Sequence, residues 1–246
     1  MRWLSNPSTD PFYNMAFDEW CLQNGPKDEV IFYLWRNSPS VIIGISQNQY
    51  AEVNLPYLKE HGINLVRRST GGGAVYHDLQ NLNYSFVGPL TLLGTNAEGE
   101  HPSAVLMMAK ALSEFGVNAE VSGRNDIFVD GHKVSGYAKR VWKDRTIVHG
   151  TLMYDVDIET LTAALDTPDS KLHRKGVASV RSRVTNLKDL MPFDSLDSLQ
   201  AALQEQFSAS DPEIVLTPGQ LAEIEAIRKN KYSNPDWIEG KWTEND

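Results

Sequence analysis

Runs of apolar residues in the first half of the chain predict strands and two helices. Asp10 followed by Pro11 is typical of a helix start, and apolar residues then recur at helical spacing as far as Cys21. A second helix, over 55–60, is expected to end at Gly62. Three further runs are predicted to be strands: 30–35, 40–44 and 83–87.

The second half of the chain also contains signals for strands and helices. Asp130-Gly131 lies between apolar runs and predicts a β-hairpin, and 146–154 is expected to be the next strand of the meander. Capping residues predict four helices, which would begin at Ser103, Asp157, Ser195 and Thr217. Residues 89–102 are expected to form a loop, and residues 231–237 are expected to run into a polar tail.

Residues 67–78 contain the most unusual local pattern, two arginines followed by a hydroxyl pair and three glycines. Consecutive glycines weaken regular structure, so they make sense where a ligand lies against the main chain. Apolar strands are expected on both sides, over 63–66 and 74–76. The guanidinium of Arg68 matches phosphate or carboxylate, which indicates an anionic ligand. The pattern is neither a phosphate-binding loop nor a dinucleotide fingerprint, and a flexible surface loop is the alternative.

Lys133 and His149 are further candidates. Lys133 follows the predicted hairpin on a strand interrupted by Gly136 and Ala138, and small residues beside it suggest that a ligand approaches closely. The alternative is an exposed strand lysine. His149, beside Gly150 in an apolar strand, is by itself typical of a hydrogen-bonded core histidine.

Residues 171–188 form the most basic segment of the chain and contain no acidic residue. With Gly176 and several hydroxyl side chains, this local positive field suits a polyphosphate. A solvated basic loop is the alternative.

Composition narrows the class of protein. A chain of 246 residues, 41% hydrophobic and 22% charged, suits one large globular domain or one and a half. The net charge of -9 argues against a general nucleic-acid or anionic-membrane binder. The single Cys21 excludes a disulfide framework, and no metal-ligand spacing occurs. Because neither a signal peptide nor an apolar run of membrane-spanning length is visible, we expect a soluble cytoplasmic protein.

Several motifs, taken together and in order, carry a resemblance to a known family. They are DPFYNMA at 10–16, LWRN at 34–37, RRSTGGGAVYHD at 67–78, GRND at 123–126, KVSG at 133–136, HGTL at 149–152, KG at 175–176 and SVRSRVTNL at 179–187. Any one of these motifs is weak, but the ordered set covers nearly the whole chain and is specific. The chain resembles the lipoate–protein ligase A family of the biotin/lipoate protein ligase superfamily.

The resemblance implies an α+β fold with a mixed β-sheet flanked by helices, related to class II aminoacyl-tRNA synthetases. It implies that ATP, with Mg²⁺, activates (R)-lipoate to lipoyl-AMP. The lipoyl group would then pass to a lysine on a lipoyl domain, in E2 subunits of 2-oxoacid dehydrogenases or in the glycine-cleavage H protein.

The resemblance also implies which residues form the site. Lys133 would be the catalytic residue, placed against the activated carboxyl and the phosphate. Because a carboxylate attacking the α-phosphorus brings two anions together, cations such as Lys133 and Arg68 suit the step. No residue is assigned as a metal ligand. The expected ligand-binding residues are Arg68, Gly71, Gly72, Gly73, Ala74, Val75, Tyr76, His77, Asp126, Ser135, Gly136, His149, Gly150, Arg181 and Arg183.

The family pattern leaves alternatives. Its full-length ligases commonly carry a further small C-terminal domain, so residues 1–246 are expected to be the large catalytic domain, naturally short or truncated. Losing the small domain would impair activation more than transfer. A related octanoyl or lipoyl transferase needs a cysteine nucleophile, and Cys21 lies in the first predicted helix, away from Lys133. A lipoyl-adenylate-binding module that needs a partner is a third reading. Biotin–protein ligase is a fourth, disfavoured because its arginine and glycine signature differs from that of 67–73.

Overall fold

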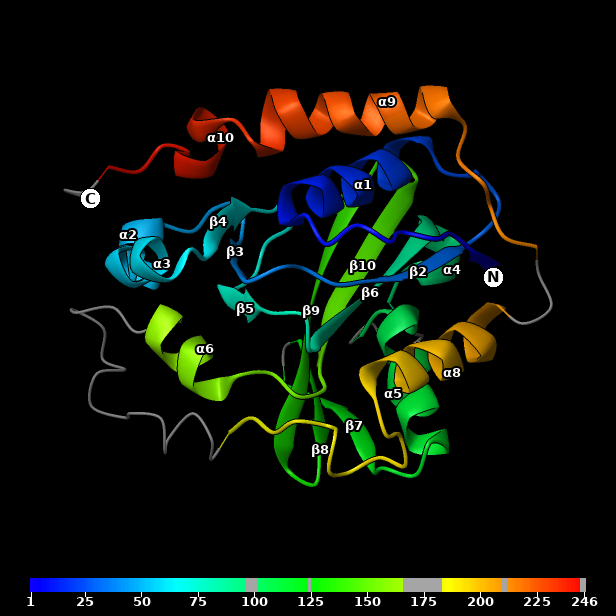
Figure 1. The fold of residues 1–246 in the computed structure, drawn as a ribbon. Helices are drawn as coiled ribbons and strands as arrows, with labels where there is room; N and C mark the ends of the chain where they lie inside the picture. Colours follow the sequence, from blue (N-terminus) through cyan, green and yellow to red (C-terminus); the bar gives the residue numbers. More distant parts are fainter. Residues whose placement is uncertain (96–100, 124, 166–182, 209–211, 244–246) are drawn as a thin grey trace.

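Two β-sheets organise the chain in a computed structural model, which describes residues 1–95, 101–123, 125–165, 183–208 and 212–243 (Figure 1). The larger sheet has the order β1-β2-β6-β10-β9-β8-β7 and the smaller one β4-β3-β5. Among the described strands, only β1 with β2 and β3 with β4 pair in parallel. The bounds are β1 Arg2–Trp3, β2 Ile31–Trp35, β3 Ser40–Ile43, β4 Asn64–Arg67, β5 Val75–His77, β6 Asn81–Pro89, β7 Ala119–Ser122, β8 Asp126–Val129, β9 His132–Trp142 and β10 Arg145–Met153.

Helices cover both faces of the larger sheet and one end of the smaller. α1 lies on one face of the large sheet with α9 packed along it, and α5 and α8 cover the opposite face (Figure 1). The mixed α+β class is therefore confirmed. The helices are α1 Pro11–Asn24, α2 Gln49–Glu52, α3 Leu55–His61, α4 Leu90–Leu93, α5 Ser103–Glu114, α6 Ile158–Leu165, α8 Leu196–Ser208, α9 Pro218–Ile227, the π-helix η1 Arg228–Tyr232 and α10 Pro235–Glu239.

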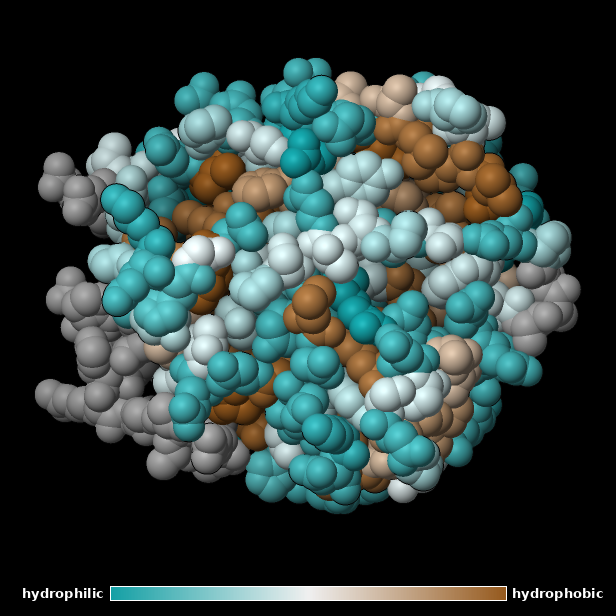
Figure 2. Space-filling model, in the orientation of Figure 1, coloured by the Kyte–Doolittle hydropathy of each residue, from teal (hydrophilic) through white to brown (hydrophobic). Residues whose placement is uncertain are grey.

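The continuous apolar run of β2 packs into two separate hydrophobic cores. Phe32 and Leu34 pack into the core under α5 and α8, while Ile31, Tyr33 and Trp35 pack into the core under α1. Successive side chains of a strand point to opposite faces, so a strand buried on both faces needs apolar residues throughout. A third core lies between the small sheet and the helices α3 and α6. Hydrophilic side chains predominate on the face shown in Figure 2, where apolar surface forms separate areas.

Local signals in the sequence predicted several boundaries correctly. Asp130 and Gly131 both adopt positive φ, 50° and 79°, as the tight hairpin between β8 and β9 requires. Asp10 accepts hydrogen bonds from the backbone N–H groups of Phe12 and Tyr13. Gly62 ends α3 in the left-handed conformation, and Thr217 and Gln220 form the predicted capping box of α9.

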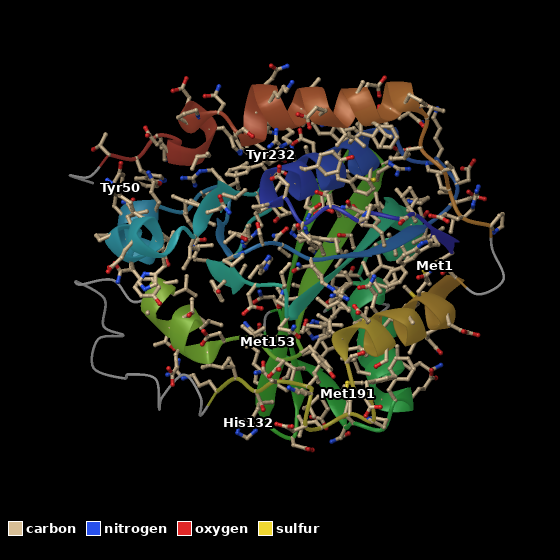
Figure 3. All side chains as sticks on the ribbon, in the orientation of Figure 1. Met1, Tyr50, His132, Met153, Met191 and Tyr232 are labelled. Carbon is tan, nitrogen blue, oxygen red and sulfur yellow. The ribbon has the colours of Figure 1, made fainter. Side chains whose placement is uncertain are left out.

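Two expectations were wrong. Ser103 is the first helical residue of α5 and not its cap, a position taken by Pro102 without a side-chain hydrogen bond. The predicted loop 89–102 contains the short helix α4, and its residues 96–100 lie outside the described part of the chain. In the segment 231–237, Tyr232 is fully buried and donates its hydroxyl hydrogen bond to Glu19 of α1 (Figure 3).

The first helix also departs from its predicted pattern. It buries Asp18 and Glu19 together with its apolar residues, so more than one face is covered by protein. Cys21 is fully buried, and burial followed by the nearby Asp18 raises the pKa of its thiol well above the usual value. A thiol in such a place is a poor nucleophile. In the described parts of the chain, no helix is long and apolar enough to cross a membrane.

Candidate active site

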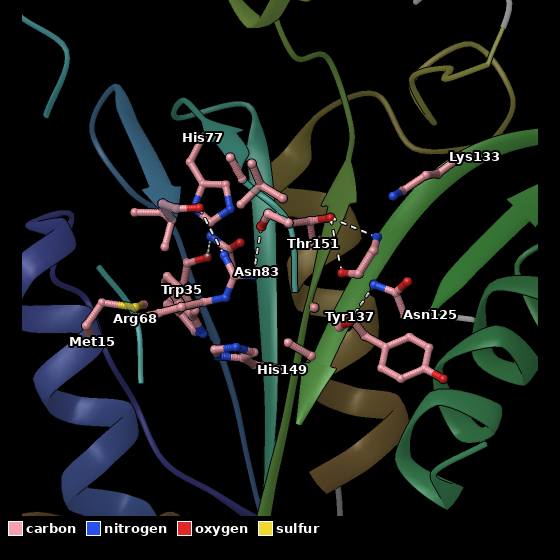
Figure 4. A pocket seen from close by; sticks show the side chains of 17 residues that line it. Met15, Trp35, Arg68, His77, Asn83, Asn125, Lys133, Tyr137, His149 and Thr151 are labelled. Atoms are coloured by element: carbon pink, nitrogen blue, oxygen red, sulfur yellow. Dashed lines mark hydrogen bonds between the residues drawn. The ribbon is translucent and has the colours of Figure 1, made fainter. Parts of the chain in front are cut away.

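A cavity of about 580 Å³, open to solvent, lies where the two sheets meet (Figure 4). One wall is formed by β5 and the segment before it, the opposite wall by β9 and β10, and α1, β2, β3 and β6 contribute single side chains. The lining residues are Met15, Trp35, Ile42, Arg68, Gly73, Ala74, Val75, His77, Asn83, Asn125, Lys133, Gly136, Tyr137, Ala138, His149, Gly150 and Thr151.

Most of the predicted site residues meet in this cavity. Those that line it are Arg68, Gly73, Ala74, Val75, His77, Lys133, Gly136, His149 and Gly150. Those that do not line it are Gly71, Gly72, Tyr76, Asp126, Ser135 and Arg183. Arg181 falls in 166–182, outside the described residues. Tyr76 instead packs into the third core, because side chains alternate along β5 and only its neighbours face the cavity.

The structure also places in the cavity residues that the prediction omitted. Met15, Trp35 and Thr151 lie within motifs that had been recognised, so their motif membership was a usable signal. Asn83 comes from a strand that reads as an ordinary core element. Its part in the cavity depends on how distant elements pack, which no local pattern reveals.

Lys133 lies at a fork in the sheet, in the part of β9 that is not paired with β10. Both its side chain and its backbone have partners there. Its ammonium nitrogen lies 2.7 Å from a carboxylate oxygen of Asp126. β9 pairs with β10 only from Tyr137 onward, so the backbone of Lys133 has one free side. Residues 183–185 fill it: the Lys133 N–H donates to the Arg183 carbonyl at 2.7 Å, and the Thr185 N–H donates to the Lys133 carbonyl at 3.0 Å. Arg183 thus contributes its main chain to the site.

Gly136 provides space for Lys133 itself. A Cβ atom at Gly136 would lie 3.1 Å from the Lys133 ammonium nitrogen, closer than such contacts normally are. The Gly136 N–H donates to the Thr151 hydroxyl at 3.1 Å, which replaces the missing backbone pairing at the fork. The small residues beside Lys133 therefore let its side chain lie along its own strand toward the cavity.

Arg68 is buried and organises the glycine loop, residues 69–74. Each of its three nitrogens donates a hydrogen bond, to the Thr70 hydroxyl and to the carbonyls of Ile42, Gly71 and Gly73. Burial lowers its pKa to about 10, so the guanidinium is charged at neutral pH. No described carboxylate forms an ion pair with it. The cavity wall therefore carries an uncompensated positive charge, which favours an anionic ligand.

His77 is neutral and hydrogen-bonded from one side. The Asn14 side-chain amide donates to the Asn37 carbonyl oxygen at 2.8 Å, so the Asn37 amide group donates to Nδ1 of His77 at 3.0 Å. Desolvation, followed by the charges of Arg68 and His149, lowers the pKa of His77 to about 3. This buried ring contributes to the cavity wall without adding charge.

Replacing His77 with glutamine is expected to reduce the acid sensitivity of the fold. The pKa of His77 falls from 6.5 to about 3 on folding. The unfolded chain therefore takes up a proton in this range that the folded chain excludes, and the stability present above pH 6.5 is lost as the pH falls toward 3. Near pH 5 the loss is about 2 kcal/mol, because one pKa unit corresponds to 1.36 kcal/mol.

Urea unfolding near pH 7 and pH 5 measures this effect. The drop in free energy of unfolding between the two conditions should be about 2 kcal/mol smaller in His77→Gln than in the unaltered protein. His132→Gln, at an exposed position on β9, is the matched control. The same drop in His77→Gln and in the unaltered protein would contradict the assignment.

Comparison with known proteins agrees with this geometry. The family model described as lipoyl protein ligase A/B catalytic domain matches residues 10–208. Lipoate-protein ligase LplJ of Bacillus subtilis is 38% identical over 98% of this chain and 74% of its own. A bi-partite lipoate protein ligase of Thermoplasma acidophilum superposes with a TM-score of 0.85 at 30% identity, over 98% of this chain and 97% of that chain. Lipoate-protein ligase A bound with ATP superposes with a TM-score of 0.82 at 29% identity, over 98% of this chain and 99% of that chain.

The mixed sheet, the glycine loop held by a buried arginine and the lysine at the sheet fork define a ligase catalytic domain. The chain belongs to the lipoyl protein ligase A/B catalytic domain family. It is an enzyme of the lipoate–protein ligase type.

Proposed function

We propose that this domain joins lipoate to ATP, giving lipoyl-AMP, and then transfers the lipoyl group to a lysine on a lipoyl domain of an acceptor protein. One observation carries the proposal: a single cavity combines apolar walls with two cations, Lys133 and Arg68, on different sides (Figure 4). The apolar surface of Met15, Trp35 and Ile42 fits an acyl chain. The cations fit its carboxylate and the nucleotide phosphates. A similar ligase binds ATP, and the archaeal relative belongs to a system with an E2 lipoyl domain.

In the first step, a carboxylate oxygen of lipoate attacks the α-phosphorus of ATP, and pyrophosphate leaves. Negative charge from two anions gathers at one point, so fixed cations lower the barrier more than they stabilise the substrates. Lys133 is placed for this role, because its ammonium lies in the cavity and is positioned by Asp126 and by 183–185. Mg²⁺ would bind mainly to phosphate oxygens and water, since no cluster of three potential metal ligands occurs among the described residues.

In the second step, the amine of the acceptor lysine attacks the acyl carbon, and AMP leaves. The adenylate is already activated, so the protein has mainly to hold the two reactants in line. The cavity is open to solvent, which gives an incoming lysine access to the acyl carbon.

A second reading is a lipoyl-adenylate-binding domain that needs a separate partner for activation. It is favoured by the match to nearly the whole of one chain of a bi-partite ligase. Pyrophosphate release with lipoate and MgATP, measured with and without the accessory chain of such a ligase, separates the readings. Release by this chain alone supports the complete reaction. Release only with the accessory chain, together with transfer from supplied lipoyl-AMP, supports the second reading. If the chain shows no pyrophosphate release and no transfer under any of these conditions, both readings are contradicted.

Replacing Gly73 with valine is expected to reduce lipoate affinity while the fold stays intact. Gly73 lines the cavity, and a Cβ atom there meets no other atom within 4 Å. The valine side chain therefore fits the protein but occupies ligand space, and a loss of about tenfold or more in affinity is expected from blocked apolar contact. Gly72→Val is a poorer test, because Gly72 has φ 95° and its Cβ would lie 2.8 Å from the Arg68 guanidinium.

Calorimetry with lipoate measures this effect, with melting curves to confirm the fold. Gly71→Val is the matched control, since Gly71 is exposed, sterically open and outside the cavity lining. Normal lipoate affinity in folded Gly73→Val would show that the ligand does not lie against this glycine.

A further inference from the structure

A buried carboxylate outside the cavity lining is bonded to three neighbouring strands. Asp18 of α1 is 5% exposed. Tyr33, Ser85 and His149 lie in one row across β2, β6 and β10, where Ser85 is paired with both of the others. The hydroxyls of Tyr33 and Ser85 donate to one Asp18 oxygen at 2.6 and 3.0 Å, and Nδ1 of His149 lies 2.6 Å from the other. The described residues give Asp18 no lysine or arginine partner.

The hydrogen bonds that reach the Asp18 carboxylate have a fixed direction, because a carboxylate only accepts. One arm begins at Arg68, which can only donate: its Nε–H bonds to the Thr70 hydroxyl at 3.0 Å, and that hydroxyl lies 2.9 Å from Nε2 of His149. The other arm begins at Trp35, also a donor only, whose indole N–H bonds to Ser85 at 3.0 Å. Both arms end at a carboxylate, which only accepts. His149 therefore carries a proton on Nδ1 and donates it to Asp18.

This direction determines what the cavity walls present. Trp35 and His149 both line the cavity, yet the indole N–H and both imidazole nitrogens are bonded to groups outside its lining. These walls therefore offer ring carbon surface, which suits an apolar ligand. Thr70 belongs to the glycine loop, and Arg68 holds the carbonyls of that loop. The position of the loop is thereby connected to α1.

We propose that Asp18 is a positioning residue of the ligand cavity. Through His149 and Thr70 it orients Arg68 and the glycine loop, and through Ser85 it orients Trp35. The proposal rests on the proposed function in so far as the ligand is lipoate. A carboxylate that only stabilises the fold would support the same packing but would not control the proton position on His149.

Asp18→Asn should reverse the direction of the hydrogen bond between residue 18 and Nδ1 of His149. The carboxamide keeps the size of the side chain but faces His149 with an N–H group when its oxygen accepts from the two hydroxyls. The imidazole then has to carry its proton on Nε2, as a carboxamide imposes in other buried Asp–His pairs. That proton faces the Thr70 hydroxyl, which then has to accept it.

Nitrogen NMR of the His149 ring tests this without any ligand. We expect Nδ1 to be protonated in the unaltered protein, and a ring that carries its proton on Nε2 alone in Asp18→Asn. A native ring with no proton on Nδ1 would overturn the proposal. So would a ring in Asp18→Asn that keeps its proton on Nδ1. The native spectrum decides the matter even if Asp18→Asn does not fold.

Thr70 provides the test at the loop. Thr70→Val keeps the shape but removes the hydroxyl, and is expected to weaken lipoate binding about tenfold, the scale of the two hydrogen bonds lost. Thr70→Ser restores the hydroxyl and should restore affinity. Thr146→Val is the matched control, because Thr146 is buried on β10, the strand of His149, and its hydroxyl donates to backbone carbonyls.

Calorimetry with lipoate distinguishes the outcomes. Native affinity in Thr70→Val, or equal losses in Thr70→Val and Thr70→Ser, would overturn the proposal. If the unaltered protein does not bind lipoate, the proposed function fails, and the ring protonation of His149 still decides the role of Asp18.

Discussion

Replacing Lys133 with alanine is expected to slow lipoate-dependent pyrophosphate release by about a hundredfold or more, the scale of one preorganised electrostatic donor. The ammonium lies at the cavity beside Asp126, where charge gathers in the transition state. Transfer from supplied lipoyl-AMP should also slow, since the same charge holds the adenylate. Lys133→Arg should not restore either rate. The side chain lies against Gly136 with little room, and a planar guanidinium cannot replace a compact ammonium there.

Lys139→Ala is the matched control, because Lys139 is exposed on the same strand and does not line the cavity. Both half-reactions should proceed normally in this variant. Near-normal rates in Lys133→Ala would return Lys133 to the role of an ordinary strand lysine. Arg68 would then be the described cation that remains to stabilise the reaction.

Replacing Arg67 with methionine is expected to lower the free energy of unfolding by about 3 kcal/mol or more, because several buried acceptors lose a charged donor. Arg67 is 2% exposed. It donates to carbonyls of the 44–47 segment, to the Gln49 side chain and to the carbonyls of Ile238 and Glu239. It thereby joins the small sheet to the last described helix.

Urea unfolding measures this loss. Arg2→Met is the matched control: the Arg2 guanidinium forms an exposed pair with Glu29 at 3.5 Å, and such pairs contribute at most about 1 kcal/mol. Equal stability of Arg67→Met and the unaltered protein would show that these carbonyls find other partners. Since Arg67 does not line the cavity, lipoate binding by the folded fraction should change much less than stability.

Features that depend on neighbouring residues were predictable from the sequence. The hairpin at Asp130-Gly131 follows from two positions that need positive φ, and the ends of α1, α3 and α9 follow from capping groups within four residues. The ordered motifs that resemble the lipoate–protein ligase A family predicted that Lys133, Arg68 and His149 belong to one site. The structure places all three around one cavity.

What the sequence did not reveal depends on distant contacts. Asp18 reads as a polar position of an amphipathic helix, and its burial becomes evident only when Tyr33, Ser85 and His149 line up across three strands. Arg68 reads as a free phosphate ligand, whereas the folded loop directs its own carbonyls to the guanidinium. The four residues of α4 are too few for a periodic pattern.

The fork beside Lys133 bears on the order in which the chain folds. The hairpin of β8 and β9 needs only residues near in sequence, but the second edge of Lys133 is completed by 183–185, about fifty residues further on. Contacts between residues far apart in sequence form slowly, because a long loop must close first. The sheet can therefore assemble before the active lysine acquires both of its backbone partners. Amide hydrogen exchange at Lys133 and Thr185 should then report a late, shared event, distinct from the protection of the β6–β10 ladder.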